Sequence, residues 1–241
     1  MKRTERHHLK ENEVAEWVLD LKDQFEANRQ LITYGGIAVL VVAAAVLGTL
    51  AWRSMGAERA NAALAAAMTV AEAPVQPPSV AEQGKLPAQA AGTYPSEKSR
   101  HEAALPKLLE AANAYPDSEA GIVARYRAAA ALVALGRADE GIQRYREVIE
   151  KGTGVVQTMA KLGIADAQLM AGKFDEAAKG LTELAGQSGT ETPVDGVLMQ
   201  LGRTYRLAGK NAEAKKAFQR ILDEFPQSVY AGVARREVES L

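Results

Sequence analysis

The feature that most constrains the fold is a repetition in the C-terminal half of the chain, where three segments align on a glycine. The aligned residues, Gly136, Gly172 and Gly209, lie 36 and 37 residues apart, a spacing typical of helical repeat proteins. Each glycine follows a helical pattern and permits a tight turn at positive φ. A second helical pattern then begins with a small residue and continues with larger apolar residues, in the triplets Gly141, Tyr145 and Val148; Ala177, Leu181 and Leu184; and Ala214, Phe218 and Ile221. The repetition predicts a series of helical hairpins, with a nonrepetitive helical bundle as the alternative.

The third copy resembles the tetratricopeptide repeat, a helix–turn–helix unit of about 34 residues. Its matching residues are Leu201, Gly202, Tyr205, Gly209, Ala214, Phe218 and Pro226. A degenerate copy is expected upstream, with residues 55–72 as its first helix and Ala104, Leu108 and Ala111 in its second. The resemblance implies an all-α fold in which the hairpins stack as an α-solenoid, closed by a capping helix from Gln227 to Leu241.

A second constraint is an uncharged stretch of 22 residues that runs from Leu31 to Trp52. As a helix it would be about 33 Å long, enough to cross the roughly 30 Å hydrocarbon core of a bilayer. Tyr34 and Trp52 lie near its ends, where amphipathic rings favour the membrane interface. A buried core helix usually keeps a polar face, and the apolar region of a cleaved signal peptide is shorter and nearer the start. We therefore interpret residues 31–52 as a transmembrane helix that acts as an uncleaved signal anchor.

The distribution of basic residues predicts how this helix crosses the membrane. Six lysines and arginines precede it, whereas the first thirty residues after it contain only Arg53 and Arg59. This excess places the N-terminus in the cytoplasm and the rest of the chain on the other side. The absence of cysteine fits an exported domain and excludes a disulfide scaffold or a thiolate metal site. A formal net charge of −1 argues against nucleic-acid binding, which favours a basic excess.

The regions on either side of the apolar stretch differ in composition. Residues 1–30 are a charged tail whose apolar stripe predicts an amphipathic helix, formed by Val14, Trp17, Val18, Leu21 and Phe25. This helix would bind a protein partner or support a homo-oligomer, unless it only extends the membrane helix. Residues 53–97 begin with an Ala-rich helix and continue with a loop rich in proline and glycine. Residues 98–241 contain the repeats and the capping helix.

The order of these regions resembles a bacterial family of single-pass membrane proteins with tetratricopeptide-like repeats, which includes the ancillary subunit of the SecYEG translocon. The resemblance implies an anchor in the inner (cytoplasmic) membrane and repeats in the periplasm that link the translocon with exported proteins or chaperones. The turns Tyr115-Pro116-Asp117-Ser118 and Phe225-Pro226-Gln227-Ser228 are also similar to turns in periplasmic cell-division coordinators and outer-membrane assembly lipoproteins. An envelope-organising or self-assembling structural protein is therefore the alternative.

Catalytic chemistry has few candidate residues in this sequence. Only three histidines are present, His7 and His8 in the tail and His101 before the repeats. The sequence contains no nucleophile elbow, phosphate-binding loop or zinc-binding helix motif. We therefore expect no enzymatic activity, no cofactor and no metal.

Protein interaction is the expected function, and the resemblance implies where a partner binds. Stacked repeats form a concave surface lined by the first helix of each hairpin. Methionine and leucine side chains on such a surface suit adaptable contacts with apolar helices or extended segments, although ordinary packing between repeats is the alternative for each of them. The implied groove residues are Val123, Tyr126, Ala130 and Val133 in the first copy, Met159, Leu162, Asp166, Leu169 and Met170 in the second, and Met199, Arg203, Arg206 and Leu207 in the third.

The charged groove residues limit the kind of partner. Arg203 and Arg206 are expected to be exposed and to pair with carboxylates of a partner. One tetratricopeptide subfamily binds acidic C-terminal tails through Lys and Asn residues, but the matching positions here hold Tyr126, Ala130, Leu162 and Asp166. This sequence therefore does not predict that binding mode.

Overall fold

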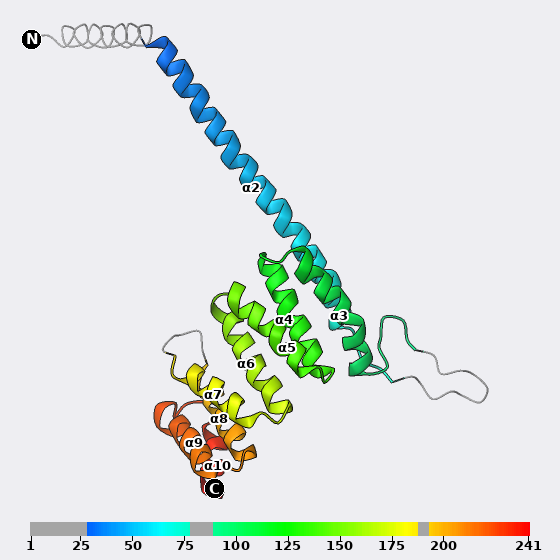
Figure 1. Ribbon diagram of the computed structural model, residues 1–241, viewed down its shortest axis with the longest axis vertical. Coiled ribbons are helices and arrows are strands. Elements are labelled where there is room, and N and C mark those ends of the chain that lie inside the picture. Colours follow the sequence, from blue (N-terminus) through cyan, green and yellow to red (C-terminus); the bar gives the residue numbers. More distant parts are fainter. Residues whose placement is uncertain (1–27, 78–88, 188–192) are drawn as a thin grey trace, which may run out of the picture. The chain divides into compact units, whose positions relative to one another are not determined.

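The computed structural model describes residues 28–77, 89–187 and 193–241. Within these ranges the chain is helical and forms no β-strand, apart from one isolated bridge between Val75 and Tyr94, which confirms the predicted all-α fold. The predicted tail helix lies outside the described residues. The helices are α2 (Arg29–Ala71), α3 (Glu97–Ala114), α4 (Glu119–Ala134), α5 (Ala138–Lys151), α6 (Gly154–Met170), α7 (Phe174–Ala185), α8 (Val194–Leu207), α9 (Asn211–Glu224) and α10 (Ala231–Ser240) (Figure 1).

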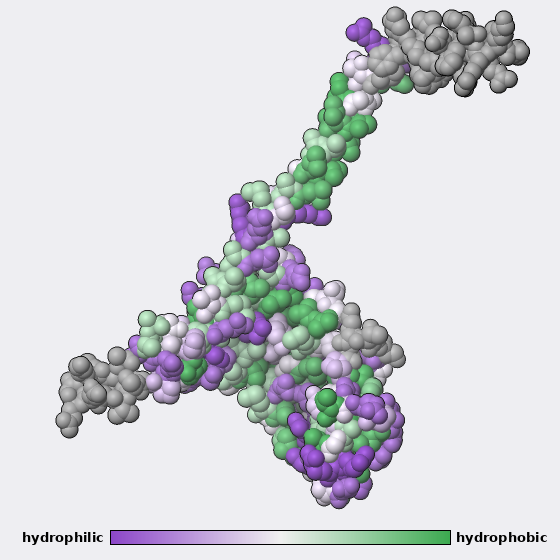
Figure 2. Space-filling model, turned by 180° about the vertical axis from the view of Figure 1, so that it is seen from behind, coloured by the Kyte–Doolittle hydropathy of each residue, from purple (hydrophilic) through white to green (hydrophobic). Residues whose placement is uncertain are grey.

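Contacts divide the chain into two compact units, residues 1–56 and residues 57–241. In the first unit, α2 exposes its apolar side chains, with Leu31, Tyr34 and Trp52 exposed by 76%, 71% and 79%, and Figure 2 shows an apolar surface along this helix. It is the one helix in the described part of the chain that is long and apolar enough to span a membrane, by length and composition. The helix does not end at Trp52 but continues to Ala71. The apolar stretch and the predicted Ala-rich helix are therefore one element.

In the second unit, each aligned glycine ends the first helix of a hairpin. Gly136, Gly172 and Gly209 have φ angles of 78°, 73° and 73°, in the left-handed region that only glycine enters at no steric cost. The amide of the following residue donates to a carbonyl of the helix just ended, as in the bond of 2.9 Å from Arg137 N–H to the Leu132 oxygen. These turns join α4 to α5, α6 to α7, and α8 to α9, as the repeat alignment predicts.

The hairpins stack in chain order, because each helix from α3 to α10 packs against the next and α4 also contacts α6. The end of α2, where a degenerate upstream copy was expected, joins the core of this stack. Ala67 near the end of α2 packs with Leu108 of α3 and Leu132 of α4 in one buried cluster. Serine residues at the start of α3 form a capping box, in which Ser96 and Ser99 satisfy each other's backbone amides. Serial packing of this kind is the solenoid architecture that the repeats predict.

Helix α10 closes the stack. Its Ala234 is fully buried in the core of the last two repeats, and Val233, Val238 and Leu241 pack against that core. The capping helix begins at Ala231 rather than at Gln227, because the preceding residues form a turn in which the Ser228 hydroxyl donates to the Asp195 carboxylate over 2.6 Å. The cap covers apolar surface that a further repeat would otherwise bury.

Three lysine–aspartate pairs join corresponding turns of neighbouring hairpins, and the two partners of each pair are 34 or 35 residues apart in the sequence. Their nitrogen–oxygen distances are 2.5 Å for Lys151–Asp117, 2.9 Å for Lys173–Asp139 and 2.7 Å for Lys210–Asp175. The hydrogen bond from Lys151 lowers the pKa of Asp117, and the bonds to Asp139 and Asp175 raise the pKa of their lysines. Because the aspartates are exposed, each pair adds little stability.

Candidate partner-binding groove

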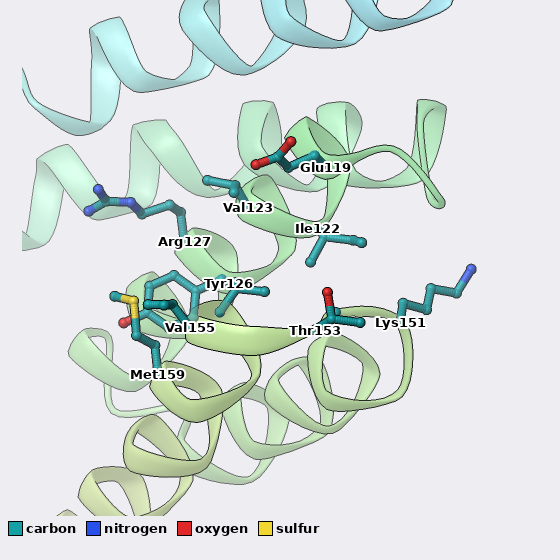
Figure 3. A pocket seen from close by; sticks show the side chains of 11 residues that line it. Glu119, Ile122, Val123, Tyr126, Arg127, Lys151, Thr153, Val155 and Met159 are labelled. Atoms are coloured by element: carbon teal, nitrogen blue, oxygen red, sulfur yellow. The ribbon is translucent and has the colours of Figure 1, made fainter. Parts of the chain in front are cut away.

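Helices α4 and α6 and the turn between α5 and α6 enclose a groove of about 580 Å³. A groove of this size is large enough for several side chains of a partner. Figure 3 shows side chains from both helices directed toward one another across it. The lining residues are Glu119, Ile122, Val123, Tyr126, Arg127, Lys151, Gly152, Thr153, Val155, Val156 and Met159.

The wall formed by α6 is apolar and accessible. Val155 and Met159 are one helical turn apart and are 57% and 41% exposed. The turn before α6 is only two residues long, Gly152 and Thr153, which keeps the start of α6 close to the end of α5. Unlike scattered surface apolar residues, these two face a concavity, which is typical of a contact site for another molecule.

The floor of the groove rests on a pair of tyrosines. The ring centroids of Tyr126 and Tyr145 are 5.5 Å apart and the rings are tilted by 56°, a favourable edge-to-face type of arrangement. Tyr145 is buried and lies against Gly163 of α6, where a Cβ atom would come within 2.4 Å of the ring. Burial raises the pKa of both phenols, so both stay neutral and contribute an apolar, rigid base.

Asp166 lies further along α6 and links this region to the third repeat. Its carboxylate accepts a hydrogen bond from the Gln200 amide of α8, and its negative charge adds to the raised pKa of Tyr126 and Tyr145. Desolvation by neighbouring atoms raises the pKa of Asp166 itself. The carboxylate is thus committed to an internal contact between repeats.

The groove is charged only at its rim. Glu119 in the first turn of α4 and Arg127 two turns later lie on either side of Val123 (Figure 3). Lys151 also lines the groove, but its ammonium group is paired with Asp117. The sequence prediction named Val123 but missed Glu119, Arg127 and Val155. For Glu119 and Arg127, the only signal in the sequence was their spacing of four residues from Val123, which places all three along one face of a helix.

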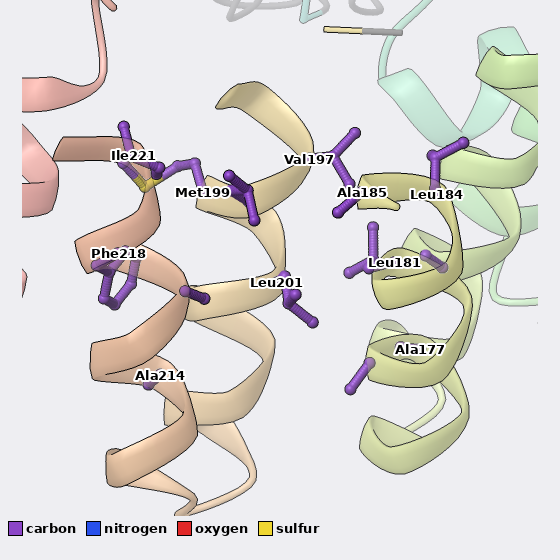
Figure 4. Packing of buried hydrophobic residues seen from close by; sticks show 14 of the residues in the cluster. Ala177, Leu181, Leu184, Ala185, Val197, Met199, Leu201, Ala214, Phe218 and Ile221 are labelled. Carbon is purple, nitrogen blue, oxygen red and sulfur yellow. The ribbon is translucent and has the colours of Figure 1, made fainter. Parts of the chain in front are cut away.

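The structure brings together some of the predicted groove residues and separates others. Tyr126 and Met159 line the same groove. Val133 and Met199 are instead buried, with exposures of 8% and 2%, and Figure 4 shows Met199 directed toward Ile221 in the core. Neither side chain is available to a partner, because the second helix of each hairpin covers it.

The remaining predicted residues lie outside the groove between α4 and α6. Leu162 is half-buried against the core of the later repeats. Met170 and Arg203 are exposed, and Arg206 is exposed but forms an ion pair with Glu237 of the capping helix. A partner that reached Arg206 would compete with this internal carboxylate.

The described residues include few side chains suited to catalysis or metal binding. They contain no group of three or more His, Cys, Asp or Glu side chains placed to hold a metal ion. His101 of α3 is half-buried, and its ring nitrogen lies 3.7 Å from the Glu97 carboxylate.

Comparisons with known proteins concern the fold. The model of a family described as a tetratricopeptide repeat-like domain matches residues 22–239. No curated protein sequence matches the chain. Among solved structures, the chain is similar to that of the TPR-like repeats of a putative kinesin light chain from Podosopora anserina. The two chains share 15% sequence identity, and the TM-score is 0.48. The match covers 59% of this chain and 77% of that one, and a point variant of the same repeats gives the same values.

Proposed function

We propose, because the chain belongs to the tetratricopeptide repeat-like domain family, that its stacked hairpins act as a protein-interaction scaffold. The single observation that carries this proposal is the groove between α4 and α6, in which the exposed Val155 and Met159 face a cavity of about 580 Å³. An apolar cavity with a few polar groups at its rim is the usual form of a binding site. We assign the scaffold no catalytic role.

We further propose that α2 tethers the scaffold to a membrane. An uncharged stretch with exposed Leu31, Tyr34 and Trp52 costs free energy in water and gains it in a bilayer. The excess of basic residues before the stretch supports a cytoplasmic N-terminus and repeats on the other side, in the periplasm of a bacterium. Tethering would raise the local concentration of the groove near membrane-bound partners.

The partners that we propose are the translocon together with exported proteins or periplasmic chaperones. This proposal rests on the resemblance in the order of regions and on the apolar wall of the groove. Exported chains emerge unfolded, and their apolar segments fit an accessible apolar surface. A self-assembling, envelope-organising protein is the second candidate, and it is favoured by the uncovered apolar helix surface, which also includes Gly48 with open space around it.

The proposal is tested by purifying the full chain in detergent, together with the variant Met159→Glu, and identifying the proteins that accompany each by mass spectrometry. Translocon components or exported proteins should accompany the unaltered chain and be depleted from the variant, because a charge in the groove would repel apolar segments. Replacement of the exposed Lys179 on α7 by Glu provides the control. Equal recovery from all three chains would contradict a groove function, and recovery of the chain alone, as an oligomer, would favour self-assembly.

A further inference from the structure

We infer that the groove between α4 and α6 binds an extended partner segment in which an acidic, an apolar and a basic side chain occupy alternate positions. The inference rests on the proposed function, since it specifies which polypeptides that groove accepts. It follows from the arrangement of charges along α4 and from the spacing of the residues on that helix face.

One face of α4 presents an anion, an apolar side chain and a cation in line. Glu119, Val123 and Arg127 are spaced by four residues, so they share one helix face at intervals of about 6 Å. All three line the groove, and Figure 3 shows Val123 between the two charged side chains. A segment lying along this face meets positive charge at one end and negative charge at the other.

Both charges at the ends of this face are uncommitted. Among the described residues, neither the Glu119 carboxylate nor the Arg127 guanidinium has an ion-pair partner or a side-chain hydrogen-bond partner. Lys151, the third charged group at the rim, is neutralised by Asp117 at 2.5 Å. A partner therefore gains two new charge pairs without breaking an existing one, provided that its acid faces Arg127 and its base faces Glu119.

The spacing of the face matches an extended chain. Side chains on one side of a strand recur every second residue, about 6.6 Å apart. This interval is close to the interval of about 6 Å between Glu119, Val123 and Arg127 on α4. The recognised pattern is thus acid–x–apolar–x–base, read in either chain direction, with the apolar side chain between Val123 and the wall formed by Val155 and Met159.

The experiment presents a display library of random short peptides to the immobilised full chain in detergent micelles. The unaltered chain should enrich peptides with the acid–x–apolar–x–base pattern. Arg127→Gln should remove the preference for the acid, Glu119→Gln should remove the preference for the base, and Arg235→Gln, which alters an exposed arginine of α10, should change neither. Circular dichroism of each variant checks that the helices remain folded, which is expected because neither altered side chain is buried in the core.

An enriched peptide then tests each pair directly by fluorescence anisotropy. Arg127→Gln should weaken its binding about threefold to fivefold, and a peptide with Gln in place of the acid should lose this sensitivity. Suppose that peptides are enriched and that Met159→Glu abolishes the enrichment, but that the peptides show no charged pattern or have their matching residues at helical spacing. This result would overturn the inference and leave the groove function standing. No enrichment, or enrichment insensitive to Met159→Glu, would overturn both.

Discussion

At the scale of single residues, the close approach of helices depends on glycines whose role is specific to their position. A Cβ atom at Gly202 of α8 would lie 2.4 Å from the fully buried ring of Phe218 on α9, whose place in the core is visible in Figure 4. Gly180 of α7 also lies within a helix, but a Cβ atom there would meet nothing within 4 Å. The same substitution should therefore have opposite effects at the two sites.

We predict that Gly202→Ala destabilises the repeats by about 1–3 kcal/mol, because the added methyl overpacks the core. Gly180→Ala should stabilise them by about 0.5–1 kcal/mol, because alanine restricts the unfolded chain and favours the helix. Thermal unfolding of the full chain, followed by circular dichroism, measures both changes. An unchanged melting temperature for Gly202→Ala would mean that α8 and α9 are not packed as closely as described.

Asp166 provides a prediction about pH. Desolvation raises its pKa above the ordinary value of 3.8, so its ionised form is less favourable in the folded state than in the unfolded state. This cost is complete above the folded pKa, decreases as the pH falls through it, and is absent below the unfolded value. Asp166→Asn removes the cost and retains an oxygen that accepts the hydrogen bond from Gln200.

Asp166→Asn should therefore raise the melting temperature at neutral pH, by no more than about 2 °C since the exposed carboxylate is partly screened by solvent. The advantage should shrink as the solution is acidified and vanish below about pH 4. The comparison requires melting curves of both chains at several pH values. A variant that is less stable at pH 7 would show that the negative charge itself stabilises the contact between α6 and α8.

The sequence could place residues on a helix face but not decide whether a neighbouring helix covers that face. Val133 illustrates the difficulty. In the first copy the small residue of the second helix is Gly141, and a Cβ atom there would lie 2.5 Å from Val133. Helix α5 therefore presses on a position that the family register assigns to the groove. Glu119 and Arg127 were missed for the opposite reason. The alignment with the family does not assign these two positions to the groove, although both line it.

At the scale of elements, the sequence predicted the hairpins well because their signals are local. Positive φ at Gly136, Gly172 and Gly209 is a property of three residues and their turns. The start of α10 was harder to predict from the sequence, because it depends on a hydrogen bond from Ser228 to Asp195, a residue of a different helix. Long-range contacts of this kind carry no signal in the neighbouring sequence.

The capping helix provides a prediction at this scale. Ala234 is fully buried where α10 meets the last repeat, whereas the adjacent Arg235 is exposed. Ala234→Asp should destabilise the repeats by roughly 2–4 kcal/mol, because it buries an unpaired charge. Arg235→Asp should have little effect. Equal melting temperatures for the two variants would show that α10 does not cover the core in solution.

At the scale of the whole molecule, the proposed membrane anchor and its proposed orientation are open to a direct test. The chain contains no cysteine, so a single introduced thiol reports one position. We predict that Lys179→Cys reacts with a membrane-impermeant maleimide in intact spheroplasts, whereas Lys10→Cys in the tail reacts only after lysis. The opposite pattern would invert the proposed orientation, and release of the chain from membranes by alkaline carbonate would contradict the anchor.

The central claim is that a partner polypeptide occupies the groove between α4 and α6, and the methionines of the chain test it most directly. Met159 and Met170 are 41% and 67% exposed, whereas Met199 is 2% exposed, and oxidation of methionine to the sulfoxide follows exposure. Peroxide should oxidise Met159 more slowly in native membranes than in the purified chain, while Met170 reacts equally in both and Met199 in neither. Equal oxidation of Met159 in membranes and in the purified chain would show that nothing covers the groove and would contradict the account.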